Sequence, residues 1–116
     1  MITNITGRHI EITQAIRQHI EERIARAATE WPPIQSVHVV LNLEKQTRCI
    51  AEVVLQAPHH GTVEAKEESH DMYRSVDLAI EKVDHQIHKW KEKRQEAHKT
   101  RAGLGENERA AQDQEG

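Results

Sequence analysis

The chain has 116 residues, enough for one domain around one hydrophobic core and too few for two. Hydrophobic residues make up 36% of it and aromatic residues 3%, with no Phe, so the core must be aliphatic. No apolar run approaches the roughly 20 residues that cross a bilayer, and the first residues lack an export signal. We therefore expect a cytoplasmic protein that does not bind a membrane.

Residues 2–5 predict a short strand that ends by Gly7, with a brief extension through 10–12. Thr13 is typical of a helix N-cap and predicts a helix over residues 14–29. A Trp-Pro-Pro sequence then ends this helix, because proline lacks the amide donor and restricts the residue before it. The apolar stripe of the helix consists of Ile16, Ile20, Ile24 and Ala27.

Three strands in an antiparallel meander follow. We expect them at 37–44, 48–57 and 62–69, separated by polar turns at 45–47 and 58–61. Apolar and polar residues alternate along each strand, which indicates one buried face. The residues predicted to face inward are Val37, Val39, Leu41, Leu43, Cys49, Ala51, Val53, Leu55, Ala57, Val63 and Ala65. The single cysteine among them forms no internal disulfide, and we interpret it as buried and inert.

The longest periodic segment begins at His70 or Asp71 and continues to about Thr100. Its apolar residues recur every three or four positions, which places them on one face of a helix. They are Met72, Val76, Ala79, Ile80, Val83, Ile87 and Trp90. A second, cationic stripe lies about 100° around the same helix. It consists of Lys82, His85, Lys89 and Lys93.

The C-terminal residues 101–116 show no periodic pattern and hold four acids against two Arg. We therefore expect a folded domain over residues 1–100 and a disordered, polar and acidic tail after it.

These elements predict an α+β fold in the order β-α-β-β-β-α. Two helices with one apolar stripe each can cover one face of a four-stranded sheet. A right-handed crossover from the first strand to a parallel neighbour makes the sheet mixed and sets the helices side by side. We therefore expect the basic flanks of the two helices to face one another across a single groove. Its predicted walls are His19, Arg23 and Arg26 on the first helix and the cationic stripe on the second.

The formal net charge of −3 argues at first against a nucleic-acid partner, but the charge is unevenly distributed. Residues 85–100 hold five Lys or Arg against two acids. Charges more than about 8 Å apart are largely screened at physiological salt, so a local basic surface can exist on an acidic protein. Because Lys and Arg displace counterions from phosphates, the groove predicts RNA binding, and a solvated helix face is the alternative.

Neither a cofactor nor catalysis is indicated. The nine His residues are scattered and accompany no Cys pair or HExxH spacing, which argues against a metal site. There is no glycine-rich phosphate loop and no GxSxG motif, so we expect no enzyme and no small-molecule substrate. Tyr73 and Trp90 lie at or beside the apolar stripe, where packing is a better interpretation than base stacking.

Two stretches resemble a known family. ITGRHIEITQAIRQHIEERI near the N-terminus and SHDMYRSVDLAIEKVDHQIHKWK in the last helix are similar to the ribosome hibernation-promoting factors, also called ribosome-associated inhibitors, protein Y or sigma-54 modulation proteins. The resemblance covers residues 1–95 and implies the same fold, similar to double-stranded-RNA-binding domains. It also implies binding to the small ribosomal subunit and its rRNA in the decoding channel. Members exclude mRNA and tRNA there under stress or in stationary phase, by occupancy and without catalysis.

By position, the resemblance implies rRNA contacts from basic residues on both helices and after the first strand. They are Arg8, Arg23, Arg26, Lys82, Lys89, Lys91 and Lys93. His85 joins them from the cationic stripe, and at His85 and His88 relatives often carry Arg or another polar residue. Because histidine becomes charged as pH falls through about 6.5, we expect rRNA binding to tighten as pH falls toward about 6.

The subtype stays open. Long members carry a further C-terminal domain that pairs ribosomes, for which 116 residues leave no room, and we expect a monomer off the ribosome. Some short members assist ribosome dimerisation, whereas others oppose it through a polar, often acidic tail, which the composition of residues 101–116 resembles more. Two other functions also stay open: a double-stranded-RNA-binding module and a protein-binding modulator of transcription.

Overall fold

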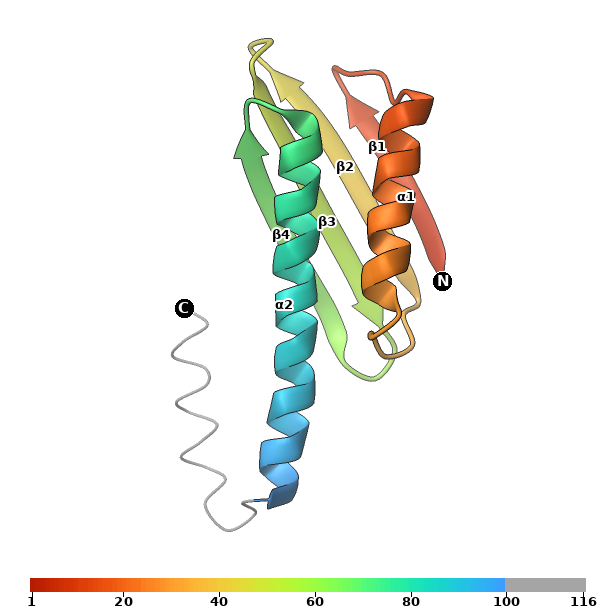
Figure 1. Cartoon of the computed structure of the whole chain (residues 1–116), viewed down its shortest axis with the longest axis vertical. Helices are drawn as coiled ribbons and strands as arrows, with labels where there is room; N and C mark the ends of the chain where they lie inside the picture. The colour runs from red at the N-terminus through yellow and green to blue at the C-terminus, as the bar shows by residue number, and fades with distance from the viewer. Residues whose placement is uncertain (100–116) are drawn as a thin grey trace.

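The structure is a computed structural model that describes the backbone of residues 1–99 and the side chains of residues 1–90. Its elements are β1 (Ile2–Arg8), α1 (Gln14–Ala28), β2 (Ser36–Glu44), β3 (Arg48–Ala57), β4 (Gly61–Ser69) and α2 (Met72–Lys99). Both helices lie side by side on the same face of one four-stranded sheet (Figure 1). The predicted α+β fold is confirmed, whereas the predicted tail at 101–116 lies outside the described residues.

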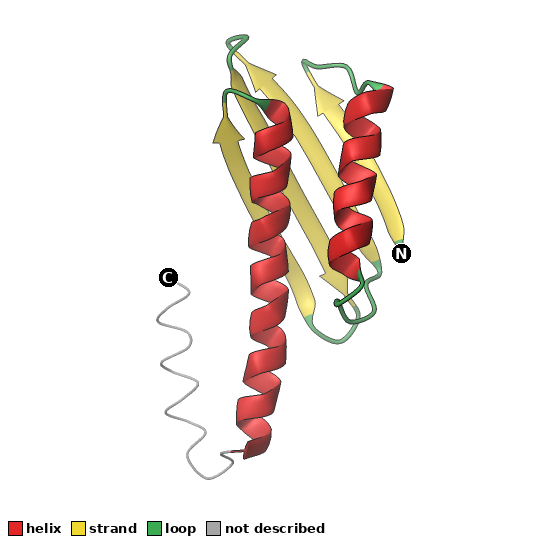
Figure 2. Cartoon of the chain, viewed as in Figure 1, coloured by secondary structure: helices red, strands yellow, loops and turns green. Residues whose placement is uncertain are grey.

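The sheet has the strand order β1-β2-β3-β4. β1 runs parallel to β2 because α1 carries the chain back between them, and the other two pairs are antiparallel. The sheet is therefore mixed, as predicted, and both helices connect to it by short loops (Figure 2). This order places α2 next to β4, at one edge of the sheet, a position that shapes the site described below.

Both helices begin at a side-chain cap. The Thr13 hydroxyl accepts a hydrogen bond from the Ile16 amide at 3.3 Å, as predicted for α1. The Asp71 carboxylate accepts one from the Tyr73 amide at 3.0 Å at the start of α2. α2 therefore begins at Met72 rather than at His70 or Asp71, because a capping residue lies outside the helix that it caps.

β1 is longer than the sequence indicates. The predicted strand ends by Gly7, but β1 continues to Arg8, and Gly7 pairs with Leu41 of β2. A Cβ atom on Gly7 would lie 2.5 Å from the Ile10 carbonyl oxygen and 3.0 Å from Ile12 Cδ1. Gly7 therefore marks a close approach of the chain to its own backbone inside the strand, and not the turn that its residue type indicates.

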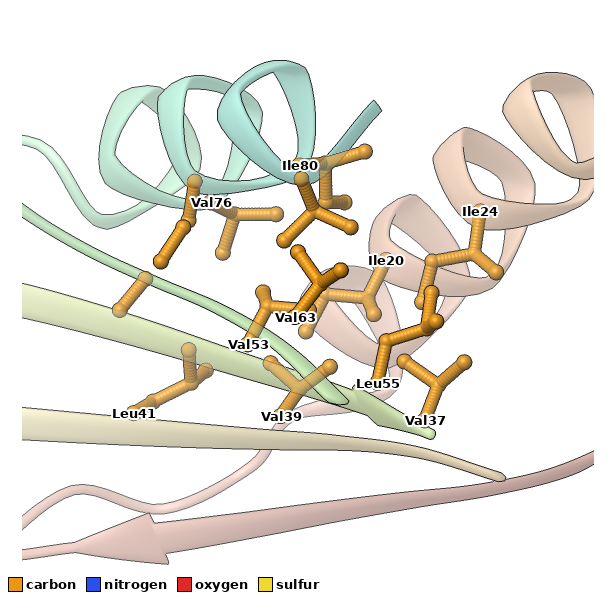
Figure 3. Close-up of a cluster of buried hydrophobic side chains, with 14 of the residues drawn as sticks. Ile20, Ile24, Val37, Val39, Leu41, Val53, Leu55, Val63, Val76 and Ile80 are labelled. Atoms are coloured by element: carbon orange, nitrogen blue, oxygen red, sulfur yellow. The ribbon is translucent and has the colours of Figure 1, made fainter. Parts of the chain in front are cut away.

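The core fills the space between the helices and the covered face of the sheet (Figure 3). All residues predicted to face inward are buried, except four that are only partly buried: Ala27, Leu43, Cys49 and Trp90. The prediction that Cys49 is fully buried is wrong: it is only partly buried, at the start of β3 opposite Ser69, the last residue of β4. It still packs against the core.

α2 continues past the sheet. Trp90 packs against the core and stacks on His60 of the β3–β4 turn, with ring centroids 4.7 Å apart, which confirms packing as its role. Beyond Trp90 the helix runs on to Lys99 and extends past the ends of the strands (Figure 1). Within residues 1–99, neither helix combines the length and the apolar character needed to cross a bilayer.

Candidate nucleic-acid interface

The side of α2 that faces α1 is acidic. Asp77 accepts a hydrogen bond from His19 of α1, with a distance of 2.8 Å between His19 Nε2 and Asp77 Oδ1. Arg23 of α1 lies between Asp77 and Glu81, with its Nε 3.0 Å from Asp77 Oδ1 and a terminal nitrogen 3.8 Å from Glu81 Oε2. His19 and Arg23 of this α1 flank are thus directed at carboxylates of the same chain.

The acidic side continues toward the C-terminal end of α1. Asp84 accepts a hydrogen bond from the Trp31 indole nitrogen at 2.7 Å. His88 lies between Asp84 and Glu30, at 3.8 Å and 3.5 Å, and forms ion pairs with them only when its ring is protonated. We call this row of contacts, from His19–Asp77 to His88–Glu30, the helix seam. It holds four carboxylates against one guanidinium and two histidines.

Arg23 belongs to this seam rather than to an open surface. Its Nε–H is buried and makes no aligned hydrogen bond, so the contact with Asp77 at 3.0 Å is an ion pair. Arg26, one turn further along α1, is exposed and has no ion pair with any side chain among residues 1–90. The two predicted rRNA contacts of α1 therefore have different environments.

The cationic stripe of α2 lies on the opposite side, toward β4. Lys82, His85, Gln86 and Lys89 form one wall of a shallow surface pocket of about 360 Å³, and residues 64–66 of β4 form the other. The Gln86 side chain donates a hydrogen bond to the Glu64 carbonyl oxygen at 3.1 Å, which ties α2 to this edge strand. We call this pocket with its lining the β4 groove.

The predicted single groove between the helices is wrong. Asp77, Glu81 and Asp84 recur at spacings of four and three residues, so they form their own stripe on α2. That stripe, and not the lysines, meets the α1 flank with His19 and Arg23. The same helical spacing argument that found the cationic stripe was sufficient to find the acidic one.

The remaining predicted contacts are dispersed. Arg8 is exposed at the end of β1, in register with Asn42. Lys91 and Lys93 lie on the part of α2 beyond Trp90, and their side chains are outside those described. Of the predicted rRNA-binding residues whose side chains are described, Lys82, His85 and Lys89 are the ones that the structure brings together in one pocket.

Tyr73 lies at the edge of the helix seam. The Tyr73 side chain is 40% exposed and meets the His19 ring edge-on at 4.9 Å, so it borders the seam rather than filling the core, contrary to the packing interpretation. Among the residues with described side chains, no three His, Cys, Asp or Glu residues are placed to hold a metal ion.

Known proteins match this chain over almost all of its helices and strands. The family described as sigma 54 modulation protein / S30EA ribosomal protein matches residues 3–95, from β1 into the projecting part of α2. The chain belongs to this family. A protein of Pseudomonas putida named ribosome hibernation promoting factor is 39% identical over 95 residues, which is 82% of this chain and 91% of that protein. Its namesake in Escherichia coli K12 is 36% identical over 93 residues, covering 80% and 96%.

Solved structures agree with the family. A ribosomal subunit interface protein from Coxiella burnetii superposes with a TM-score of 0.69 at 29% identity, covering 78% of this chain and 98% of that one. The N-terminal domain of Thermus thermophilus Protein Y gives a TM-score of 0.67 at 31% identity, covering 75% and 94%. The family match to residues 3–95 therefore spans the elements of this chain that form the helix seam and the β4 groove.

Proposed function

We propose that this chain is a ribosome hibernation factor of the cytoplasm. It binds the small ribosomal subunit through rRNA in the decoding channel and excludes mRNA and tRNA under stress or in stationary phase. Its family membership and the names of its relatives support the task. The observation that carries the contact surface is the collection of Lys82, His85 and Lys89 on one side of α2.

The proposed mechanism is occupancy. Ammonium groups on a rigid helix neutralise phosphates and release their counterions, which provides affinity that does not depend on base sequence. Side chains cannot read bases in the deep, narrow major groove of A-form RNA, so contacts to backbone and shape dominate. No step of this inhibition forms or breaks a covalent bond, which agrees with a role that is not enzymatic.

The proposed contact residues divide by their environment. Lys82, His85 and Lys89 line the β4 groove, and Arg8 and Arg26 are exposed elsewhere on the surface. Lys91 and Lys93 extend the cationic stretch of sequence beyond the sheet. Arg23 acts differently in this proposal: its ion pairs with Asp77 and Glu81 hold α1 against α2, so it positions the surface instead of binding phosphate.

Co-sedimentation with purified small subunits tests the proposal. We expect the wild-type chain to bind, and Lys89→Glu to release it, because the substitution places an anion where a phosphate is neutralised. The matched control is Lys45→Glu, which makes the same charge change in the exposed β2–β3 turn and should leave binding unchanged. Loss of binding in both variants, or in neither, would contradict the assignment of this surface.

A sucrose gradient of stationary-phase extract separates the alternatives. A hibernation factor migrates with ribosomes and dissociates as salt rises, whereas a modulator of transcription is absent from ribosomal fractions and purifies with the polymerase. A general double-stranded-RNA-binding module would bind an unrelated RNA duplex as tightly as it binds the subunit. The ratio of ribosome monomers to dimers, with and without residues 101–116, reports the subtype.

A further inference from the structure

Glu67 of β4 occupies a position that alternation assigns to the interior. Val63 and Ala65 precede it at intervals of two residues, and both are buried against α2. The Glu67 side chain is 21% exposed, and its Oε2 lies 2.7 Å from Nζ of Lys82. An acid on the covered face of the sheet thus holds one of the three cationic groups that α2 contributes to the β4 groove.

The pair is asymmetric in its exposure. Lys82 is 63% exposed, so its ammonium remains accessible to a second anion from solvent. Glu67 is confined by β3, because it pairs in register with Ala51, and by α2 above it. A half-buried carboxylate loses more hydration than an exposed one, so it benefits more from a cation within reach. The exposed Lys82 ammonium can therefore exchange Glu67 for another anion more readily than the confined Glu67 carboxylate can exchange Lys82 for another cation.

We propose that Glu67 is an internal counter-ion that competes with an RNA phosphate for Lys82. Glu67 thereby sets the affinity and the salt dependence of the α2 surface. This inference rests on the proposed function, since it identifies the competitor at that site. The exchange is reversible and involves no covalent step: Lys82 leaves the carboxylate for the phosphate, and water hydrates Glu67 until the RNA dissociates.

The expected size of the effect follows from the exposure of the pair. Ion pairs near the surface contribute little, so removing the competitor should tighten binding by about two- to fivefold. While Glu67 neutralises Lys82, a phosphate that binds Lys82 causes a smaller net release of counterions than it would in the absence of Glu67. Removing Glu67 should therefore make the slope of log K against log salt steeper, by at most about 0.9 for this one contact.

A double-mutant cycle on small-subunit binding tests the inference. We expect Glu67→Gln to bind two- to fivefold tighter than wild type, and the same substitution to have no effect when Lys82→Gln is already present. Glu67→Asp retains the charge but shortens the side chain, so it should also bind tighter. Glu64→Gln is the matched control. It removes a carboxylate from the same groove, but Glu64 forms no ion pair with Lys82.

The outcomes are distinct. Equal tightening by Glu67→Gln and Glu64→Gln, with Glu67→Asp at the wild-type value, would show a simple effect of net charge and overturn the inference. An effect of Glu67→Gln that persists beside Lys82→Gln would overturn it as well. Failure of the wild-type chain to bind small subunits at low salt would instead refute the proposed function. Glu67→Asp also provides a readable variant if Glu67→Gln does not fold.

Discussion

At the scale of single residues, Gly7 is required by the path of the chain. Its missing side chain allows the Ile10 carbonyl oxygen to approach the strand. We predict that Gly7→Ala lowers the free energy of unfolding by about 1–3 kcal/mol, the usual cost of overpacking, as measured by urea denaturation. Thr6→Ala, at the exposed neighbouring position, is the control and should change stability by less than about 0.5 kcal/mol. Equal stability of Gly7→Ala and wild type would show that the connection to α1 can move.

Arg48 determines the titration of Glu68. Its guanidinium donates two hydrogen bonds of 2.8 Å to the Glu68 carboxylate and also lies 3.2 Å from Glu44. Hydrogen bonding and charge from Arg48 lower the pKa of Glu68. A lowered pKa in the folded state stabilises the fold above the unfolded-state pKa, and this contribution is lost as pH falls through the folded-state pKa.

We therefore predict that Arg48→Gln raises the pKa of Glu68 toward the ordinary glutamate range, as followed by carbon-detected NMR titration of the side-chain carboxyl. The stability of this variant should also depend less on pH on the acid side. Lys45→Gln removes a cation from the same hairpin without contacting Glu68, so its Glu68 titration should match wild type. A Glu68 titration that does not change in Arg48→Gln would contradict the assigned cause.

Residue types alone predicted the inward-facing positions well, because alternation and helical spacing follow directly from backbone geometry. They failed at Glu67, which reads as one more solvent-facing acid in a polar strand. Alternation with Val63 and Ala65 places it on the covered side, but only the position of α2 shows that it lies 2.7 Å from Lys82. A contact between residues that are far apart in the sequence, such as Glu67 and Lys82, cannot be predicted from the pattern of either segment alone.

At the scale of elements, the β2–β3 turn contains strain. Lys45 and Gln46 both have positive φ, 52° and 62°, a region that favours glycine and asparagine. We predict that Lys45→Asn with Gln46→Gly raises stability by about 0.4–1 kcal/mol, which shifts the melting temperature upward by several degrees. Lys45→Gln removes the charge without relieving the backbone and serves as the control. No rise in melting temperature in the double variant would contradict the strain argument.

The helices illustrate the limit of reasoning from elements. Each helix and its apolar stripe could be predicted from the sequence, and α1 begins at the predicted cap. The orientation of their polar sides could not be predicted from the sequence, because it depends on which charged side chains meet when the two helices pack together. His19 and Arg23 face Asp77, so the flank that was expected to bind RNA stabilises the helix pair instead.

At the scale of the whole molecule, pH controls the sign of the charge. Protonation of all nine His residues would turn the formal net charge of −3 into +6. We predict tighter binding to small subunits at about pH 6 than at about pH 8, because histidines gain charge across this interval. His85 lies beside Lys82 and Lys89 on one wall of the β4 groove and faces residues 64–66 of β4 on the other, and His85→Gln should reduce the pH effect.

The control for this prediction is His59→Gln, which removes an exposed histidine from the β3–β4 turn and should leave most of the pH effect intact. Equal affinity of the wild-type chain at both pH values would contradict the prediction. Equal pH effects in His85→Gln and wild type would assign the effect to other histidines, among them His19 and His88 of the helix seam.

Within residues 77–89, the opposite charges on two sides of α2 also form an electric dipole across the helix, perpendicular to its backbone macrodipole. Carboxylates of Asp77, Glu81 and Asp84 lie on one side, and the ammonium groups of Lys82 and Lys89 lie on the other. A polyanion exerts a torque on such a dipole before contact and turns the β4 groove toward itself. The association rate should therefore fall as ionic strength rises, whereas the net charge of an acidic protein alone would predict a rise.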